Sequence, residues 1–152
     1  EQEYAFEEQL KWAIQLNLPV AIHTRDAFPE VINCIRNAGS ESLTGVFHSF
    51  TGNEAELASL LEFKNFKIGI NGVITFKNST LQKVLKNTTI DTIILETDAP
   101  YLAPVPYRGR TNQPVYIWKT DEKVAEVFNL SVKETIEITS SNALQLFKRV
   151  NK

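Results

Sequence analysis

The feature that most constrains the fold is a fourfold alternation of short apolar segments with helix-like stretches. The apolar segments cover residues 18–23, 45–48, 66–72 and 90–97. The last of them contains the run Ile93-Ile94-Leu95, in which polar residues do not alternate with apolar ones. Such a run is typical of a strand buried on both faces of a parallel sheet. Strands that alternate with helices predict an α/β fold with a parallel sheet.

The stretches between these segments have helical spacing of their apolar residues. Helices are expected at residues 3–17, 27–38, 54–63, 78–87 and 115–128, in a segment opened by the capping box at 131–134, and in a last short helix at 141–147. Short strand–helix units suit a (β/α)₈ barrel, which needs about 250 residues. The 152 residues supply about half of one. We therefore predict a single domain over residues 1–152 that forms the second half of a TIM barrel, with about four parallel strands and the N-terminal strands absent.

Composition narrows the classes of partner. The formal net charge is −2, so any phosphate-binding surface has to be local. The single cysteine, Cys34, permits no disulfide within the chain, which fits a reducing compartment and predicts a cytoplasmic protein. No apolar run approaches membrane-spanning length, and no signal peptide is recognisable, so no membrane partner is expected. The chain lacks methionine, which fits either a processed start or a piece of a longer protein.

Three residues that can bind a metal ion end three different predicted strands. They are His23, His48 and Asp98, and Glu96 lies two residues before Asp98, on the same face of a straight strand. Strand ends are where α/β folds build their sites. Imidazole and carboxylate groups suit divalent ions such as Zn²⁺, Mn²⁺ and Mg²⁺. Hydrogen-bonded buried histidines and a capping or salt-bridging Asp98 are the structural alternatives.

The long loop at residues 99–114 and the first strand end add features that suit an anionic substrate. Arg25 follows His23 by two residues, and Arg108 and Arg110 lie in the loop. Arginine matches phosphate geometry, although each of these could also be an ordinary surface residue. Tyr101 and Tyr107 could stack on bases of single-stranded nucleic acid. Packing within the loop is the alternative, and we expect it for Tyr101.

The ordered set of these motifs resembles the TatD family of metal-dependent deoxyribonucleases. The matching segments are residues 18–27, 45–52, 68–76, 95–104, 108–114 and 142–147. The resemblance covers essentially the whole chain and implies a barrel with a divalent-metal site, Mg²⁺ above all, that hydrolyses phosphodiester bonds of DNA. It also implies 3′–5′ exonuclease action on single-stranded DNA or on 3′ ends.

By position, the resemblance implies particular roles for the singled-out residues. His23, His48 and Asp98 match metal ligands, and Asp98 matches the aspartate that also acts on the attacking water. Glu96 resembles a supporting residue behind the ligands. Arg25 and Arg108 are the candidates for binding substrate phosphate.

Two elements of the family pattern have no match in this sequence. They are the His-x-His pair of the first strand and a glutamate on a later strand, so half of the metal ligands are missing. The chain alone could therefore be inactive, although His23, His48 and Asp98 could still bind one metal ion weakly. Open sheet edges predict self-association or pairing with the missing N-terminal half. A small-molecule amidohydrolase and a non-catalytic interaction module that keeps the fold are the alternatives at this point.

Overall fold

A computed structural model describes residues 1–151 and contains one sheet of four parallel strands. The strands are β1 (Val20–His23), β2 (Gly45–His48), β3 (Phe66–Ile70) and β4 (Ile93–Leu95), and they lie in the order β1-β2-β3-β4. Each strand pairs in parallel with the next one along the chain. The predicted α/β fold is confirmed. The last strand is shorter than predicted, because the chain leaves the regular ladder as it approaches the left-handed turn at Asp98.

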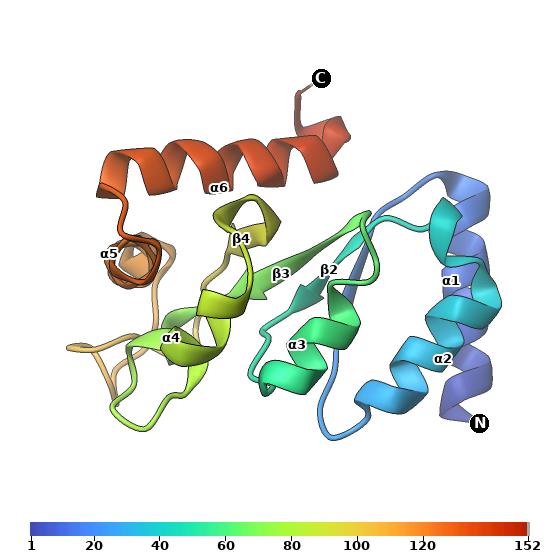
Figure 1. The fold of residues 1–152 in the computed structure, drawn as a ribbon, viewed down its shortest axis with the longest axis horizontal. Coiled ribbons are helices and arrows are strands. Elements are labelled where there is room, and N and C mark those ends of the chain that lie inside the picture. Colours follow the sequence, from blue (N-terminus) through green and yellow to red (C-terminus); the bar gives the residue numbers. More distant parts are fainter. Residues whose placement is uncertain (152) are drawn as a thin grey trace.

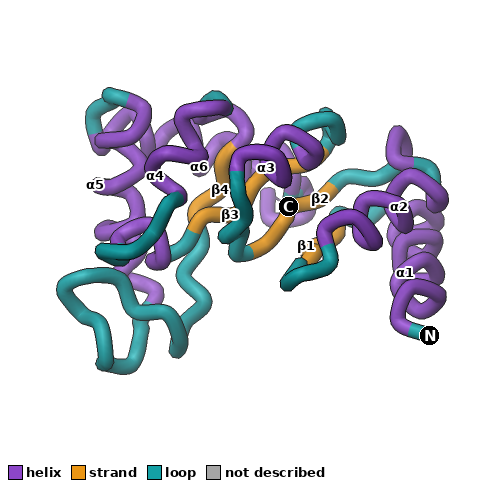
Figure 2. Tube along the Cα trace, turned by 60° about the horizontal axis from the view of Figure 1, so that its bottom comes forward, coloured by secondary structure: helices purple, strands orange, loops and turns teal. Residues whose placement is uncertain are grey.

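Six helices surround the sheet (Figures 1 and 2). They are α1 (Gln2–Leu16), α2 (Phe28–Ala38), α3 (Glu54–Leu60), α4 (Leu81–Val84), α5 (Ile117–Phe128) and α6 (Val132–Leu146). In both views α1 and α2 lie at one end of the molecule and α5 lies at the other. No helix among residues 1–151 combines the length and the apolar character that a bilayer crossing requires.

Local sequence signals explain where these helices begin and end. Asn53 and Ser131 each open a helix with a capping box, as predicted for the second of them. Asn17 and Gly39 close α1 and α2 in the left-handed conformation that such residues tolerate. The weak helix predicted at residues 78–87 is a single turn, α4, followed by a 3₁₀ turn.

The prediction of a separate last helix at residues 141–147 is wrong, because α6 runs unbroken to Leu146. Ser140 and Ser141 are exposed there, whereas the next residue, Asn142, faces the protein. Asn142 is buried, and its side-chain amide donates hydrogen bonds to the carbonyl oxygens of Ile90 (2.9 Å) and Ile93 (2.8 Å). These bonds tie α6 to the segment that enters β4.

The two faces of the sheet have different roles. Phe47, Ile68 and Ile93 belong to the large hydrophobic core shared with the helices. Val46 and Ile94 point to the opposite face and form a smaller cluster with Leu146. Side chains alternate between the faces of a strand, so the residue two places after Val46 or Ile94 shares its face. These residues are His48 and Glu96, which places them on the less filled face at the carboxyl edge of the sheet.

Candidate functional site

His48 lies between two carboxylates at the carboxyl edge of the sheet. Its Nδ1 atom is 2.8 Å from Oε2 of Glu96, and its Nε2 atom is 2.9 Å from Oδ1 of Asp98. The three side chains are mostly buried, so these contacts are only partly weakened by solvent. Both carboxylates follow β4, whereas the imidazole ends β2, so contacts across β3 bring the predicted residues together.

Gly69, on the intervening strand β3, makes these contacts possible. A Cβ atom at Gly69 would lie 2.5–2.8 Å from the carboxylate atoms of Glu96. The Glu96 side chain therefore crosses β3 over the position where any other residue would place a side chain. A glycine in a strand interior often marks such a close approach.

Asn71 and Ser49 complete the arrangement. The Asn71 amide nitrogen donates to Oδ2 of Asp98 (2.8 Å) and to the Ser49 hydroxyl (2.6 Å). The Ser49 backbone N–H donates to Oε1 of Glu96 in a short hydrogen bond. Asn71, Asp98, His48, Glu96 and Ser49 thus form a closed ring of polar contacts. Asn71 is 1% exposed, so burial restricts the movement of the amide that connects Asp98 with Ser49.

Two residues of this ring have unusual backbone conformations. Ser49 (φ 54°) and Asp98 (φ 56°) both lie in the left-handed region, which residues other than glycine enter at a cost. Each follows a strand and turns the chain away from the sheet. Strained conformations cluster at functional sites, where the surrounding contacts hold them.

Burial raises the pKa of the Glu96 carboxyl above its ordinary value, and the Asp98 charge adds to this effect. The hydrogen bonds from the Ser49 N–H and the His48 ring, together with the charge of that ring, act in the opposite direction. The Ser49 N–H and the His48 ring thus stabilise the charged form of the Glu96 carboxyl in a site whose burial favours the neutral form.

His23 and Arg25 lie at the end of β1, where the structure is more open. His23 is exposed, and its ring centroid is 5.8 Å from that of His48. The Arg25 side chain is 87% exposed, and its nearest ionic partner is Asp26 at 3.8 Å. Within residues 1–151 no three His, Cys, Asp or Glu side chains are arranged so as to hold a metal ion as they stand. The structure brings His48, Glu96 and Asp98 together, with His23 beside them.

Arg108 lies in the long loop, on an aromatic ring. Its guanidinium carbon is 3.8 Å from the centroid of the Phe76 ring. Tyr107 stacks on Tyr116, with the ring centroids 4.0 Å apart. The expectation that Tyr101 packs within the loop is wrong, because this residue is 75% exposed. The loop is held by other groups instead.

Asn112 is the residue that holds this loop against the end of β4. Its buried amide donates to the carbonyl oxygens of Thr97 (2.6 Å) and Tyr101 (2.7 Å). Sequence reasoning assigned no role to Asn112, Asn71 or Ser49. A polar residue in an apolar segment, as Asn71 is, was the only signal that could have identified one of them.

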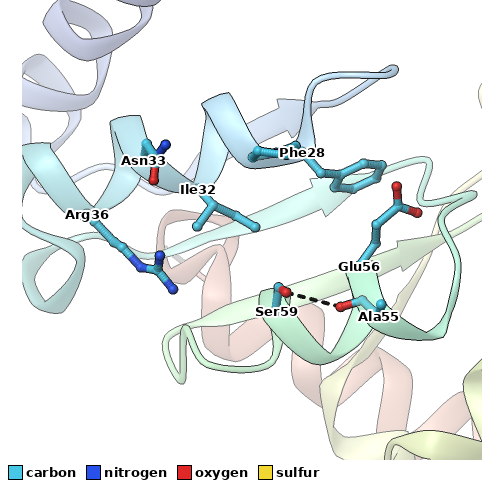
Figure 3. Close-up of a pocket in the computed structure, with 8 residues that line it drawn as sticks. Phe28, Ile32, Asn33, Arg36, Ala55, Glu56 and Ser59 are labelled. Carbon is cyan, nitrogen blue, oxygen red and sulfur yellow. Dashed lines mark hydrogen bonds between the residues drawn. The ribbon is translucent and has the colours of Figure 1, made fainter.

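A pocket of about 330 Å³ lies between α2 and α3, away from the carboxyl edge of the sheet (Figure 3). Its charged groups already have partners. Arg36 pairs with Glu62 at 2.6 Å, and Glu56 accepts the capping hydrogen bond from the Asn53 N–H. None of the predicted site residues lines this pocket, and it carries no functional assignment.

Comparisons with known proteins agree with the motifs. A family model described as TatD related DNase matches residues 1–148. The chain is 38% identical, over 97% of its length, to an uncharacterized metal-dependent hydrolase of Bacillus subtilis, YabD, and covers 58% of that protein. It is 34% identical, again over 97% of its length, to a protein of Pectobacterium parmentieri named 3′-5′ ssDNA/RNA exonuclease TatD, and covers 59% of it.

A solved structure shares the fold. The TatD homologue YjjV of Escherichia coli K12 superimposes with a TM-score of 0.89 at 26% identity, covering 97% of this chain and 56% of that one. The chain thus spans a little over half the length of the proteins it matches.

Proposed function

Because the chain belongs to the TatD-related DNase family, we propose that it provides catalytic residues of a divalent-metal-dependent hydrolase that cleaves phosphodiester bonds of DNA. The substrate is single-stranded DNA or a 3′ end, degraded in the 3′–5′ direction. The observation that carries the proposal is the His48 ring held between Glu96 and Asp98 at the carboxyl edge of the sheet. The single cysteine, Cys34, is buried and free, which supports a cytoplasmic location for this activity.

The donor groups suit a divalent ion. His48 Nε2 and Asp98 Oδ1 are 2.9 Å apart, and neighbouring ligands of an octahedral ion with bonds of about 2.1 Å lie about 3 Å apart. We assign His48, Asp98 and His23 as the residues that would hold the ion, with Mg²⁺ as the first candidate and Mn²⁺ and Zn²⁺ as substitutes. When bound, a divalent ion supplies Lewis-acid polarisation of the phosphoryl group and lowers the pKa of water.

The other residues orient these ligands and the reacting groups. Glu96 fixes the orientation of the His48 ring through Nδ1, as a carboxylate behind a ligating histidine commonly does. Asp98 accepts a proton from the attacking water as the water oxygen bonds to phosphorus and the bond from phosphorus to the leaving oxygen breaks, and Asp98 then passes that proton to the leaving oxygen. Arg25 and Arg108 neutralise the charge of the substrate phosphates.

The outer edge of β1 offers a place for a further part of the barrel or a second copy of the chain. The sheet order places β1 and β4 at the two edges. At the β4 edge, the Asn142 side chain donates a hydrogen bond to the carbonyl oxygen of Ile93. At the β1 edge, Ala21 and His23 are exposed. Unpaired strand edges favour pairing with another chain. Association through β1 is therefore part of the proposal.

The test is cleavage of 5′-labelled single-stranded DNA by the purified chain in Mg²⁺ or Mn²⁺. We expect products shortened from the 3′ end, loss of cleavage with chelator, and at least a 100-fold lower rate in the variant Asp98→Asn. Asp26→Asn removes a carboxylate that is 93% exposed and should leave the rate unchanged. Cleavage that persists in chelator or in Asp98→Asn contradicts the proposal, and absence of cleavage by the folded chain contradicts hydrolysis by this chain on its own.

A further inference from the structure

Aromatic rings and positive charge gather in residues 99–118, directly after Asp98. This segment holds four of the chain's six tyrosine and tryptophan residues, namely Tyr101, Tyr107, Tyr116 and Trp118. It also holds two arginines and no aspartate or glutamate, although the chain as a whole has a net charge of −2. Such a combination is typical of surfaces that bind single-stranded nucleic acid, where rings stack on bases and cations meet phosphates.

The rings form one surface. The Tyr107 and Tyr116 rings stack with an angle of 10° between their planes. Trp118, the second residue of α5, is 53% exposed. Beside them lies a pocket of about 480 Å³, whose lining is Tyr107, Val115, Tyr116, Trp118, Lys119 and Glu122. We call the surface made by Tyr107, Tyr116 and Trp118 the aromatic surface. Tyr107 and Tyr116 are half-buried against each other, and Trp118 is exposed beside them, so the surface offers apolar ring area next to a pocket.

The aromatic surface is fixed relative to the proposed catalytic site. Asn112 bonds the carbonyl of Thr97, the residue before Asp98, and its N–H donates to the carbonyl of Pro100 (2.9 Å). The Val105 N–H donates to the Thr75 hydroxyl (2.9 Å) on the neighbouring turn after β3. The loop that presents the rings is therefore held in place by hydrogen bonds within the chain. A surface held in its binding conformation loses less entropy when a ligand binds.

We propose that the aromatic surface binds bases of a single-stranded nucleic acid by stacking, while the phosphates of the same strand lie along Arg108 and Arg110. This inference rests on the proposed function and adds to it the place where the strand lies beyond the cleaved bond. Every base offers a stacking face, so the surface tolerates any sequence. The absence of acidic residues from this segment favours a polyanion over an uncharged protein partner.

Intrinsic fluorescence tests the inference, because the chain has only two tryptophans. Trp12 is 58% exposed on α1, at the opposite end of the molecule from α5, which carries Trp118 (Figures 1 and 2). The probe is a short oligo(dT), compared with an abasic oligomer of equal length that keeps the phosphates but lacks bases. Chelator is present, so that binding is measured separately from hydrolysis.

We expect oligo(dT) to quench the fluorescence of Trp12→Phe, which keeps Trp118, and to leave that of Trp118→Phe unchanged. Trp118→Ala should weaken oligo(dT) binding about tenfold without changing abasic binding, and Tyr116→Leu should act in the same direction. Trp12→Ala is the matched control and should bind as the parent does.

Equal binding of oligo(dT) and the abasic oligomer, without quenching of Trp118, would overturn the inference, and so would a failure to bind oligo(dT). Either result combined with metal-dependent DNA cleavage would leave the proposed function standing. Base-dependent binding without any cleavage would instead support the aromatic surface and count against the hydrolytic function.

Discussion

His23 and His48 end neighbouring strands and are paired in register, yet their surroundings differ. His48 contacts a carboxylate through each ring nitrogen and is mostly buried. The His23 ring is exposed, and its centroid lies 5.8 Å from that of the His48 ring. The two positions read alike in the sequence, because each is a histidine at the end of a short apolar strand. What distinguishes them is that His23 ends an edge strand of the sheet, whereas His48 ends an inner strand.

The difference follows from the position of each strand in the sheet. β2 has β3 on its inner side and β4 beyond it, so the two acids after β4 reach His48 across the gap at Gly69. β1 lies at the edge, and its only neighbour in the sheet is β2. The proposed ligand on the inner strand, His48, is thus pre-organised within the chain, whereas the position of His23 depends on whatever lies beyond β1.

The largest expected effect comes from removing each ring in turn. His48→Ala should lower the free energy of unfolding by about 2–3 kcal/mol, because it leaves the mostly buried carboxylates of Glu96 and Asp98 without the ring that contacts both. His23→Ala should change it by less than about 0.5 kcal/mol, since the residue is exposed. Urea unfolding of both variants at neutral pH, monitored by circular dichroism, measures the difference between their unfolding free energies. Equal losses would show that the two strand ends are equivalent and would break the comparison.

A second prediction concerns the gap over β3. Gly69→Ala should destabilise the fold by about 2 kcal/mol, because its Cβ occupies the space of the Glu96 carboxylate. Combining it with Glu96→Ala should restore most of that loss, and the non-additivity of the double-mutant cycle is the measurement. If the two substitutions simply added, the loss at Gly69 would have to come from its backbone rather than from its contact with Glu96.

A third, smaller effect comes from a buried acid outside the site. Asp121 on α5 is 4% exposed, and its Oδ1 atom is a buried oxygen without a hydrogen-bond partner. Burial, with a contribution from the Glu122 charge, raises the pKa of its carboxyl from 3.8 to about 6. The native state therefore keeps a proton that the unfolded chain releases, and the stability linked to it is lost as the pH rises from about 4 to about 6.

Asp121→Asn should remove this pH dependence and raise stability at pH 7 by about 1 kcal/mol. Unfolding midpoints measured across that pH range, with Glu122→Gln as the control for general charge effects, show whether it does. A parent chain whose stability is unchanged over this range would mean that Asp121 has found a partner. The predicted pH dependence, if observed, would sharpen the contrast with the carboxylates at the sheet edge, which are tolerated because His48 pairs with them.

Much of the fold could be predicted from the sequence, because periodicity and turn signals are local. The strand at residues 45–48 and the helix start at Ser131 were predicted correctly, and the other strands were correct to within a few residues. The break predicted near residue 141 failed, because the buried amide of Asn142 bonds to another element. Such a long-range partner leaves no local signal.

The candidate site shows the same limit. His23, His48 and Asp98 could be selected from their place at strand ends, and the structure does bring His48 and Asp98 together. The roles of Asn71 and Ser49 depend on the register of β2, β3 and β4 and on backbone conformations that the sequence does not specify. The exposure of Tyr101 likewise depends on Asn112 holding the loop from within.

The central claim is that the carboxyl edge of this sheet holds a divalent ion through His48 and Asp98, with His23 beside them. Calorimetric titration of the purified chain with Mn²⁺ tests it most directly. The account predicts saturable binding that is lost in Asp98→Asn and in His48→Ala, weakened in His23→Ala and unchanged in Asp26→Asn. Binding that survives Asp98→Asn and His48→Ala unaltered, or an absence of saturable binding in the folded parent chain, would contradict it.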